Sequence, residues 1–326
     1  MDKALEHSLH EICDAVFFYS PEEYALGAQR FPASSLENNL YGFCYTREFR
    51  LPIVNDDPPF DPNAHLLIEL SSANATRERW EYGWKISQAL PDGSVYAQKE
   101  EQSRMLRPGE FILQDSASTA QAGAWIRAFL SKEDTHSQPG FYIVHPEIAP
   151  SIEDFQTLLR VYWNIQSEGA PRLLGLITER LNALRVPFQF KTLRYIAQYR
   201  RADAAVLFTG WRYSGLVLRL AAEIYGQVED RMNSFTPLFT RKLAPGLALA
   251  EDPANGESFG MIRCRLLAQA MRNAYLKRQQ SQKARMAELR LLFEQSGLNL
   301  DLPHLSISLI DHYQMPAMET LAAAAT

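Results

Sequence analysis

The chain has 326 residues, of which 46% are hydrophobic and 22% charged, which is the composition of a folded protein with a sizeable core. Its formal net charge of −5 argues against a general nucleic-acid or anionic-membrane binder, because the chain as a whole repels phosphate. Any anion site must therefore be local, and between Arg185 and Lys242 ten Lys or Arg residues stand against four Asp or Glu. A solvated basic face is the simplest explanation of that excess.

Several common kinds of site lack their parts in this sequence. The cysteines Cys13, Cys44 and Cys264 are too few and too far apart for a disulfide framework or a metal knuckle. No HExxH pair, phosphate-binding Gly-rich loop or dinucleotide fingerprint is present. The N-terminal segment is charged where a signal peptide is apolar, and no run of about eighteen apolar residues follows. We expect a cytoplasmic protein without a metal.

The first 150 residues predict a β-rich lobe behind one helix. Apolar residues from Leu5 to Val16 recur at helical spacing, which indicates an amphipathic helix. From about residue 40 to residue 144 the sequence changes to short β-like runs. The tetrapeptide LPDG at residues 90–93 is typical of a hairpin turn between two of them.

Residues 151–318 predict a second lobe of strands and helices, and residues 319–326 a disordered tail. Ser151 and Asp154 have the spacing of a helix N-cap and its partner. The Pro- and Gly-rich segment 240–260 predicts an ordered loop. The other predicted elements are strands over 160–165, 188–193 and 204–208, helices from Pro171 and Ser214, and a helix over 261–293 interrupted near 279–283.

The predicted fold class is therefore α+β. We expect the β-rich N-terminal lobe to pack on a C-terminal lobe made of a twisted, mostly antiparallel sheet that is flanked by helices.

Alternation along the strand 188–193 places Lys191 on the face opposite Phe188 and Phe190. Several cations of the same lobe stand beside predicted strand ends or loops, and one anion-binding cleft would explain them together; they are Arg200, Arg201, Lys242 and Arg263. The plainer alternatives are a solvent-facing lysine and an ordinary ion pair between Arg201 and Asp203.

A lysine among arginines is suited to one particular reaction. A phosphorylated Ser or Thr has a weakly acidic α-hydrogen and a phosphate leaving group, so its elimination needs a neutral amine base and cations that stabilise the departing charge. Guanidinium groups grip phosphate through paired hydrogen bonds, and their positive field lowers the pKa of a neighbouring lysine. Such an elimination requires no metal or organic cofactor.

Five segments resemble the HopA-type effector family, over roughly Asn74 to Met271. They appear in one order with plausible spacing and read SSANATRERWEYGWKI, YWNIQSEGAPRLLGLITERLNALRVPFQFK, YRRADAAVLF, KLAPGLALAEDP and SFGMIRCRLLAQA. Members include type III-secreted effectors and proteins of lanthipeptide and other peptide natural-product clusters. In those clusters they are thought to eliminate phosphate from a precursor peptide after a separate aminoglycoside-phosphotransferase-like kinase has added it, leaving dehydroalanine or dehydrobutyrine.

The family is more distantly similar to phosphothreonine lyases, and this resemblance implies roles for individual residues. Lys191 matches the lysine base and Arg201 the phosphate-binding arginine that follows it. Arg160 and Tyr162 occupy the Lys-x-His strand motif, so Tyr162 stands where those lyases have a histidine acid. Phe208 stands where a tyrosine usually ends the second strand.

Our leading interpretation is a phosphoserine/phosphothreonine lyase with Lys191 and Tyr162 as catalytic residues. The phosphate-binding candidates are Arg160, Arg200, Arg201, Lys242 and Arg263. The supporting candidates are Asn164, Asp203, Phe208 and Glu251. The expected partners are a phosphorylated precursor peptide and its kinase, with no nucleic acid and no membrane. The alternatives are a catalytically silent module that binds a phosphopeptide or kinase, and a secreted effector without chemistry. Peptide capture by strand addition to the β-rich lobe is a physical option for which the sequence carries no motif.

Overall fold

The computed structural model describes residues 1–54, 65–100, 102–114, 119–253, 256–308 and 310–316. The tail predicted over residues 319–326 lies outside the described residues. The α+β fold class is confirmed, because eight α-helices accompany three antiparallel sheets in the described part of the chain.

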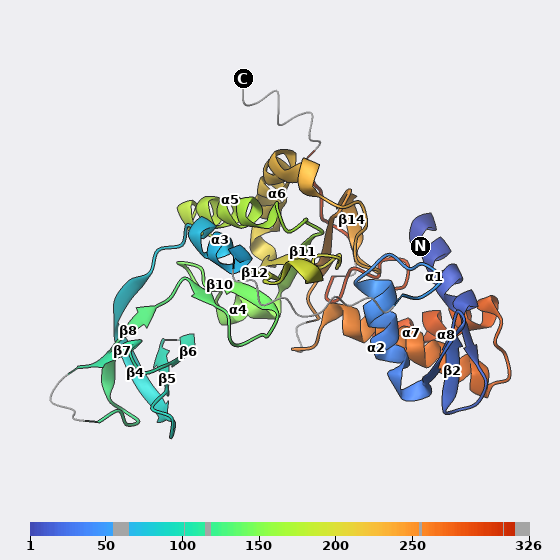
Figure 1. Ribbon diagram of the computed structural model, residues 1–326, viewed down its shortest axis with the longest axis horizontal. Coiled ribbons are helices and arrows are strands. Elements are labelled where there is room, and N and C mark those ends of the chain that lie inside the picture. The colour runs from blue at the N-terminus through green and yellow to red at the C-terminus, as the bar shows by residue number, and fades with distance from the viewer. Residues whose placement is uncertain (55–64, 101, 115–118, 254–255, 309, 317–326) are drawn as a thin grey trace.

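A seven-stranded antiparallel sheet forms the centre of the molecule (Figure 1). Its strands, in spatial order, are β14 (Arg241–Ala244), β15 (Leu247–Glu251), β11 (Leu158–Trp163), β13 (Ala205–Gly210), β12 (Phe188–Leu193), β10 (Phe141–Val144) and β9 (Glu133–Asp134). The registers align Val161 with Leu207, and Leu207 with Phe190. These apolar side chains share one face, since residues directly opposite on neighbouring strands point the same way.

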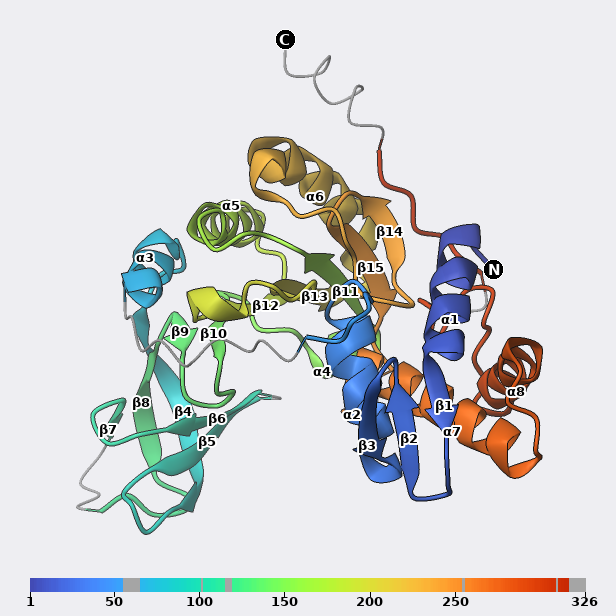
Figure 2. The same ribbon diagram turned by 45° about the vertical axis from the view of Figure 1, so that its right-hand side comes forward.

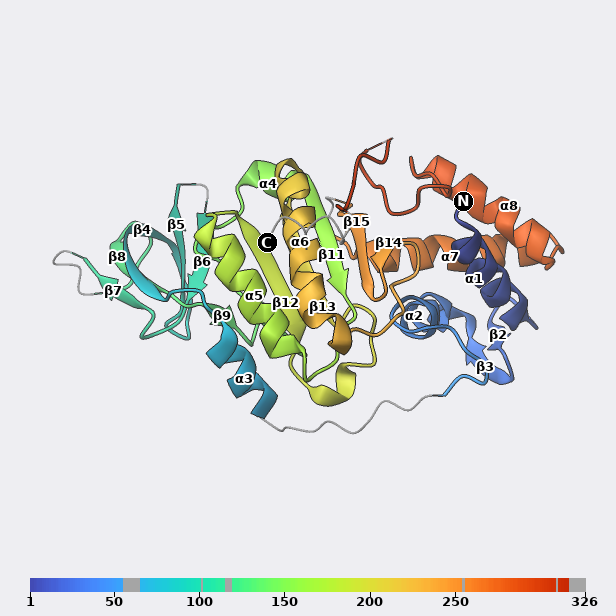
Figure 3. The same cartoon turned by 90° about the horizontal axis from the view of Figure 1, so that it is seen from above.

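Three helices cover that apolar face, as Figure 3 shows from above. They are α3 (His65–Ala73), α5 (Ala170–Ala183) and α6 (Ser214–Val228). Helix α5 begins at Ala170, so the predicted Pro171 lies in its first turn, and it buries Leu174, Ile177 and Leu181 at helical spacing. Burial of this stripe against the sheet forms the larger of the hydrophobic cores.

An N-terminal module covers part of the opposite face (Figure 2). It comprises α1 (Lys3–Ala15), the three-stranded sheet of β1 (Val16–Phe18), β2 (Glu23–Leu26) and β3 (Gln29–Pro32), and α2 (Leu36–Leu40). It packs against α7 (Phe259–Leu276) and α8 (Gln282–Gln295). Residues on both sides of the predicted boundary at residue 150 therefore share one core.

A separate five-stranded antiparallel sheet forms a β-lobe at the other end of the molecule (Figure 1). Its strands, in spatial order, are β6 (Gln102–Leu106), β5 (Val95–Lys99), β4 (Arg79–Ala89), β8 (Trp125–Leu130) and β7 (Phe111–Leu113). The predicted LPDG turn is confirmed, because the N–H of Leu90 donates to the carbonyl of Ser94 between β4 and β5. Trp84, Ile86 and their neighbours give this lobe a core of its own.

Two segments differ from their predicted structure. The predicted loop 240–260 contains the β14–β15 hairpin, whose strand β15 is buried throughout. Residues 247–251 thus lack the alternation of polar and apolar residues that marks a half-exposed strand. Helix α3 lies in a region that the sequence predicts to be β-like. The helix escapes prediction because its nine residues show little more than two turns of helical periodicity. The interruption predicted near 279–283 is confirmed, since Ser281 caps α8.

Candidate functional site

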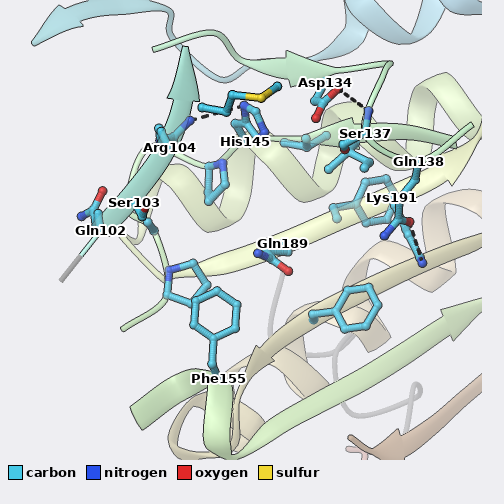
Figure 4. Close-up of a pocket in the computed structure, with 18 of the residues that line it drawn as sticks. Gln102, Ser103, Arg104, Asp134, Ser137, Gln138, His145, Phe155, Gln189 and Lys191 are labelled. Atoms are coloured by element: carbon cyan, nitrogen blue, oxygen red, sulfur yellow. Dashed lines mark hydrogen bonds between the residues drawn. The ribbon is translucent and has the colours of Figure 1, made fainter. Parts of the chain in front are cut away.

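A cleft of about 1440 Å³ opens over the part of the central sheet that the N-terminal module leaves uncovered. Its walls are strand β6 of the β-lobe, the short helix α4 (Ile152–Gln156) with Phe155, and the loop at Glu257 and Ser258. Gln189 and Lys191 lie on its floor, as Figure 4 shows. Pockets for drug-sized ligands are about 300–1,000 Å³, so this cleft has room for a stretch of polypeptide.

Lys191 lies on the floor of this cleft between two aromatic rings. Its Nζ is 4.6 Å from the centroid of Phe141 and 5.6 Å from that of Phe208. The same nitrogen donates a hydrogen bond to Oε1 of Gln138 at 3.2 Å. Burial lowers the pKa of Lys191 to about 8, and the positive charges of Arg160 and Arg201 add to this effect. At neutral pH about one amine in ten is therefore uncharged.

The negative charges of Asp203 and Asp252 act on Lys191 in the opposite direction and raise its pKa. Lys191 is therefore surrounded by two carboxylates as well as two guanidinium groups. Solvent exclusion by the rings, more than the arginine field that the sequence suggested, is the main cause of the lowered pKa.

Arg160 comes from β11 and lies across β13 from Lys191. The register aligns Arg160 with Phe208, and its Cζ is 5.2 Å from the centroid of that ring. Its Nε donates to Oδ2 of Asp252 at 2.6 Å, and its Nη2 lies 2.5 Å from the same oxygen. Nη2 also donates to the carbonyl oxygen of Glu257 at 3.4 Å. The Phe208 ring thus lies between the amine and the first guanidinium.

Arg201 follows β12 by way of a turn and reaches the same place from the other side. Its guanidinium makes a bidentate pair with Asp203, with distances of 2.8 Å from Nε to Oδ1 and 2.7 Å from Nη2 to Oδ2. Its Cζ lies 5.9 Å from the centroid of Phe141, the ring that also contacts Lys191. The structure therefore brings the predicted pair of Lys191 and Arg201 together.

Tyr162 lies on the same face of the sheet as Lys191 but does not line the cleft. Its side chain is only 2% exposed, and its hydroxyl accepts a hydrogen bond from Tyr45 at 3.2 Å. Burial raises the pKa of Tyr162, and the neighbouring Arg160 only partly offsets that shift. Tyr45 fits there because α7 has a glycine at residue 260, where a Cβ atom would come within 2.4 Å of the tyrosine ring. The predicted proton donor thus lies next to Arg160 on the same face of the sheet, where the N-terminal module covers it, and does not line the cleft.

Comparison with known protein families matches residues 133–305 to the HopA1 effector protein family. The chain belongs to this family. The matched segment contains the central sheet from β9 to β15, and with it Lys191, Arg160 and Arg201. None of the curated proteins compared with the chain matches it.

Two solved structures of effector proteins from Pseudomonas syringae share the fold. That from pathovar tomato strain DC3000 is 14% identical, covers 93% of this chain and 97% of its own, and has a TM-score of 0.50. That from pathovar syringae strain 61 is 16% identical, covers 94% of this chain and 98% of its own, and has a TM-score of 0.52. At these identities the likeness concerns the fold alone.

Four of the cations predicted to bind phosphate do not line the cleft of this HopA1-family chain. Arg201 lies beside it, against the ring of Phe141. Lys242 is on the same face as Lys191 but four strand steps away, a distance of about 19 Å. Arg200 is exposed on the turn before β13. Arg263 is fully buried in α7 and donates to the carbonyl oxygens of Pro303 and Leu305. Burial lowers the pKa of Arg263 to about 10.

Two of the supporting candidates hold the backbone in place. The amide of Asn164 donates to the carbonyl of Phe235 at 2.8 Å and accepts from Asn233 at 3.0 Å. The carboxylate of Glu251 accepts hydrogen bonds from three successive backbone N–H groups, those of residues 306–308. Burial alone would raise the pKa of Glu251, but the side-chain and backbone hydrogen bonds to this segment lower it. Both residues are structural at these positions.

One wall of the cleft could not be predicted from the sequence. Arg104 of β6 places its Nη1 3.4 Å from Nδ1 of His145, which directly follows β10. Burial, together with the charge of Arg104, lowers the pKa of His145 to about 4. A single histidine after a strand has no motif, and only the packing of the β-lobe on the sheet brings it here. No cluster of metal ligands occurs among the described residues, and none of their helices is long and apolar enough to span a bilayer.

Proposed function

We propose that this HopA1-family chain is a phosphoserine/phosphothreonine lyase that acts on a peptide. The observation that carries the proposal is the amine of Lys191, which lies between two rings at the floor of a peptide-sized cleft with a guanidinium group on either side. A lysine whose pKa is lowered to about 8 can accept a proton near neutral pH.

In the proposed reaction the neutral amine of Lys191 takes the α-proton of the phosphorylated residue. The electron pair of the broken C–H bond forms the double bond between Cα and Cβ, and the bond from Cβ to the phosphate oxygen breaks. Phosphate leaves with the electron pair of the broken Cβ–O bond, and Lys191 keeps the proton as an ammonium group. The product is dehydroalanine from phosphoserine or dehydrobutyrine from phosphothreonine.

Arg160 and Arg201 are the groups that hold the phosphate in this proposal. Each is already paired with an aspartate, but a guanidinium has five N–H donors in a fixed fork, which is more than one carboxylate uses. The aspartates keep both planes oriented while the remaining donors bind phosphate oxygens. Charge that develops on the leaving phosphate is then stabilised by groups that need not reorganise.

Tyr162 has a different role in the proposal from the one that the family resemblance implied. Because it is buried next to Arg160, it positions that guanidinium and does not touch the substrate. A substrate that binds with its phosphate as the monoanion releases HPO4²⁻, and two neighbouring cations stabilise that group without a protein acid. The absence of a histidine at this position is then compatible with elimination.

The proposed substrate is a phosphorylated precursor peptide, and its phosphate is proposed to come from a separate aminoglycoside-phosphotransferase-like kinase. The size of the cleft and the family membership support a peptide. We further propose a reducing, cytoplasmic setting, which the three unpaired and buried cysteine thiols support.

Mass spectrometry of a phosphothreonine peptide tests the proposal. Elimination removes the mass of phosphoric acid from the peptide, whereas hydrolysis removes less because water is added back. We expect elimination with the native chain, none with Lys191→Met, and a raised KM with Arg201→Lys, which cannot form the bidentate fork. An unchanged rate in the lysine variant would refute the mechanism.

A second candidate function is binding of a phosphopeptide or kinase without chemistry, as in an effector that acts through its surface. One observation favours it: Asp252 and Asp203 already occupy the forks of both arginines. If phosphate does not displace the aspartates from these arginines, the native chain binds the phosphopeptide weakly and leaves its mass unchanged. The same assay therefore separates the two functions.

A further inference from the structure

The wall of the cleft opposite Lys191 is the edge of a sheet. Strand β6 is the last strand of the β-lobe and pairs with β5 along one side only. All of residues 102–107 line the cleft. In Figure 4 Gln102, Ser103 and Arg104 of this strand lie across the cleft from Gln189 and Lys191.

The hydrogen bonds of strand β4 show which way the backbone of β5 points. Ile86 is aligned with Ala97 of β5, but its N–H donates to Ala124 and its carbonyl accepts from Gly123. Ile86 therefore turns its backbone groups away from β5. In an antiparallel ladder these groups alternate from residue to residue, so Ala97 directs its N–H and C=O towards β6.

The register of the next pair then fixes the direction of the β6 backbone. Ala97 is aligned with Arg104, so the N–H and C=O of Arg104 form hydrogen bonds with β5. Its neighbours Ser103 and Met105 direct theirs the other way, out of the sheet and into the cleft. Within the described chain, no backbone hydrogen bond from another segment reaches either of them. The side chain of Met105 is 47% exposed.

The open edge and the proposed base are a short stretch of chain apart. Arg104 contacts His145, which follows Val144, and Ile143 is aligned with Lys191 on the next strand. Two residues along β10 and one step between strands therefore separate this contact from the amine. An extended peptide advances about 3.3 Å per residue, so a few residues of it span the distance.

We propose that β6 is the docking strand for the substrate peptide. An extended segment of the peptide adds to the edge as a sixth strand and exchanges main-chain hydrogen bonds with Ser103 and Met105. The phosphorylated residue, a few positions along, then reaches Lys191. Delivery to Lys191 rests on the proposed function, whereas capture of the peptide at β6 does not.

The shape of the cleft selects a peptide over a folded partner. The edge faces inward, towards α4 and the loop at Glu257, across a space of about 1440 Å³. That space admits one extended chain but not the sheet edge of a second folded copy. Main-chain pairing also tolerates many side chains, so the substrate class is an extended segment without proline at the paired positions.

Two variants of one residue test the docking strand. Met105→Pro removes an outward N–H but keeps the ladder with β5, because proline is accommodated where an edge strand needs no donor. Met105→Ala removes the same side chain and keeps the N–H. With fluorescence anisotropy of a labelled phosphothreonine peptide, we expect binding to weaken at least about fivefold in the proline variant and less than about twofold in the alanine variant.

A modified peptide gives the same test without altering the protein. If Met105→Pro disturbs the β-lobe, as judged by circular dichroism, the native chain is titrated with a peptide that carries N-methyl groups on two alternate amides upstream of the phosphothreonine, and with the same modification downstream. We expect one of these peptides to bind at least about fivefold more weakly than the unmodified peptide. Equal binding of all three peptides overturns the proposal.

Failure of docking and failure of the lyase activity give different results. Peptide binding that depends on the N–H of Met105, with no elimination, supports the docking strand and refutes the lyase. Elimination with the same KM in Met105→Pro and Met105→Ala supports the lyase and refutes the docking strand. A change of oligomeric state in Met105→Pro, with unchanged peptide affinity, would assign the edge to a second copy of the chain and overturn the proposal.

Discussion

The ring of Phe208 lies 5.6 Å from the amine of Lys191 and, through its centroid, 5.2 Å from the guanidinium carbon of Arg160. An apolar ring thus stands between the proposed base and one proposed phosphate ligand. It excludes water from the amine, which lowers the pKa of Lys191, and it leaves the guanidinium charge in place. Phe208 therefore supports the chemistry as an apolar spacer.

Replacement of Phe208 tests this relationship. We expect Phe208→Ser to admit water beside Lys191 and to raise its pKa from about 8 towards 10.5, because burial is the largest cause of the shift. The pH at which kcat/KM reaches half its plateau should then move upward. Phe208→Leu is the matched control, since it keeps an apolar side chain. An identical pH profile in the serine variant contradicts this role.

Lys191 should lower the stability of the fold near neutral pH. Its pKa is lowered in the folded chain, so below about pH 8 the folded state holds a proton that burial disfavours. We expect Lys191→Met to raise the free energy of unfolding by about 1 to 3 kcal/mol at pH 7. The difference between variant and native chain should shrink as the pH rises from 8 to 10.5, because in this range the folded state has lost the proton and the unfolded state still holds it. Urea denaturation at several pH values measures this, and a difference that grows with pH contradicts it.

Gly260 should be required by Tyr45, the buried tyrosine whose hydroxyl donates to Tyr162. A Cβ atom there would lie 2.4 Å from a ring carbon of Tyr45, and that ring is 2% exposed and has little room to move. We expect Gly260→Ala to lower the free energy of unfolding by about 1 to 3 kcal/mol. Gly226→Ala is the control, because a Cβ atom in that helix meets nothing within 4 Å. Equal stability of the two variants would show that Tyr45 is loosely held.

Arg263 should affect stability but not phosphate binding. Its guanidinium is fully buried and donates to two carbonyl oxygens and to the hydroxyl of Ser306. We expect Arg263→Met to lower the free energy of unfolding by about 2 to 4 kcal/mol, since those acceptors lose their donor. The affinity of the folded variant for a phosphothreonine peptide should stay within about twofold of the native value. A large loss of affinity without a loss of stability would show that Arg263 binds phosphate and would contradict this prediction.

Much of the fold could be predicted from periodicity and turn signals. The amphipathic N-terminal helix, the LPDG hairpin and the strand with Lys191 on one face all follow from spacing. The β14–β15 hairpin could not be predicted, because the alternating Leu and Ala residues of β15 are buried on both faces. Polar and apolar residues alternate along a strand only where one face of the strand is exposed to solvent.

The site could be predicted in part. The pairing of Lys191 with Arg201 depends on one short turn between neighbouring strands, so their separation in sequence predicts their proximity. Lys242 and Arg263 were grouped with them by charge alone, but strand order places the first far away and helix burial removes the second from solvent. The pairing of Asp252 with Arg160 and the place of β6 at the cleft depend on how distant segments pack, which no local sequence pattern indicates.

Whether Lys191 can act as the base is tested most directly by measuring its pKa. The chain is labelled with carbon-13 at the Cε atoms of its lysines, the Lys191 signal is assigned by comparison with Lys191→Arg, and its shift is followed by NMR from pH 6 to pH 12. We expect a midpoint at about 8, well below that of an ordinary lysine. A midpoint at 10.5 or above would show an amine that stays charged near neutral pH, and the lysine could not serve as the base.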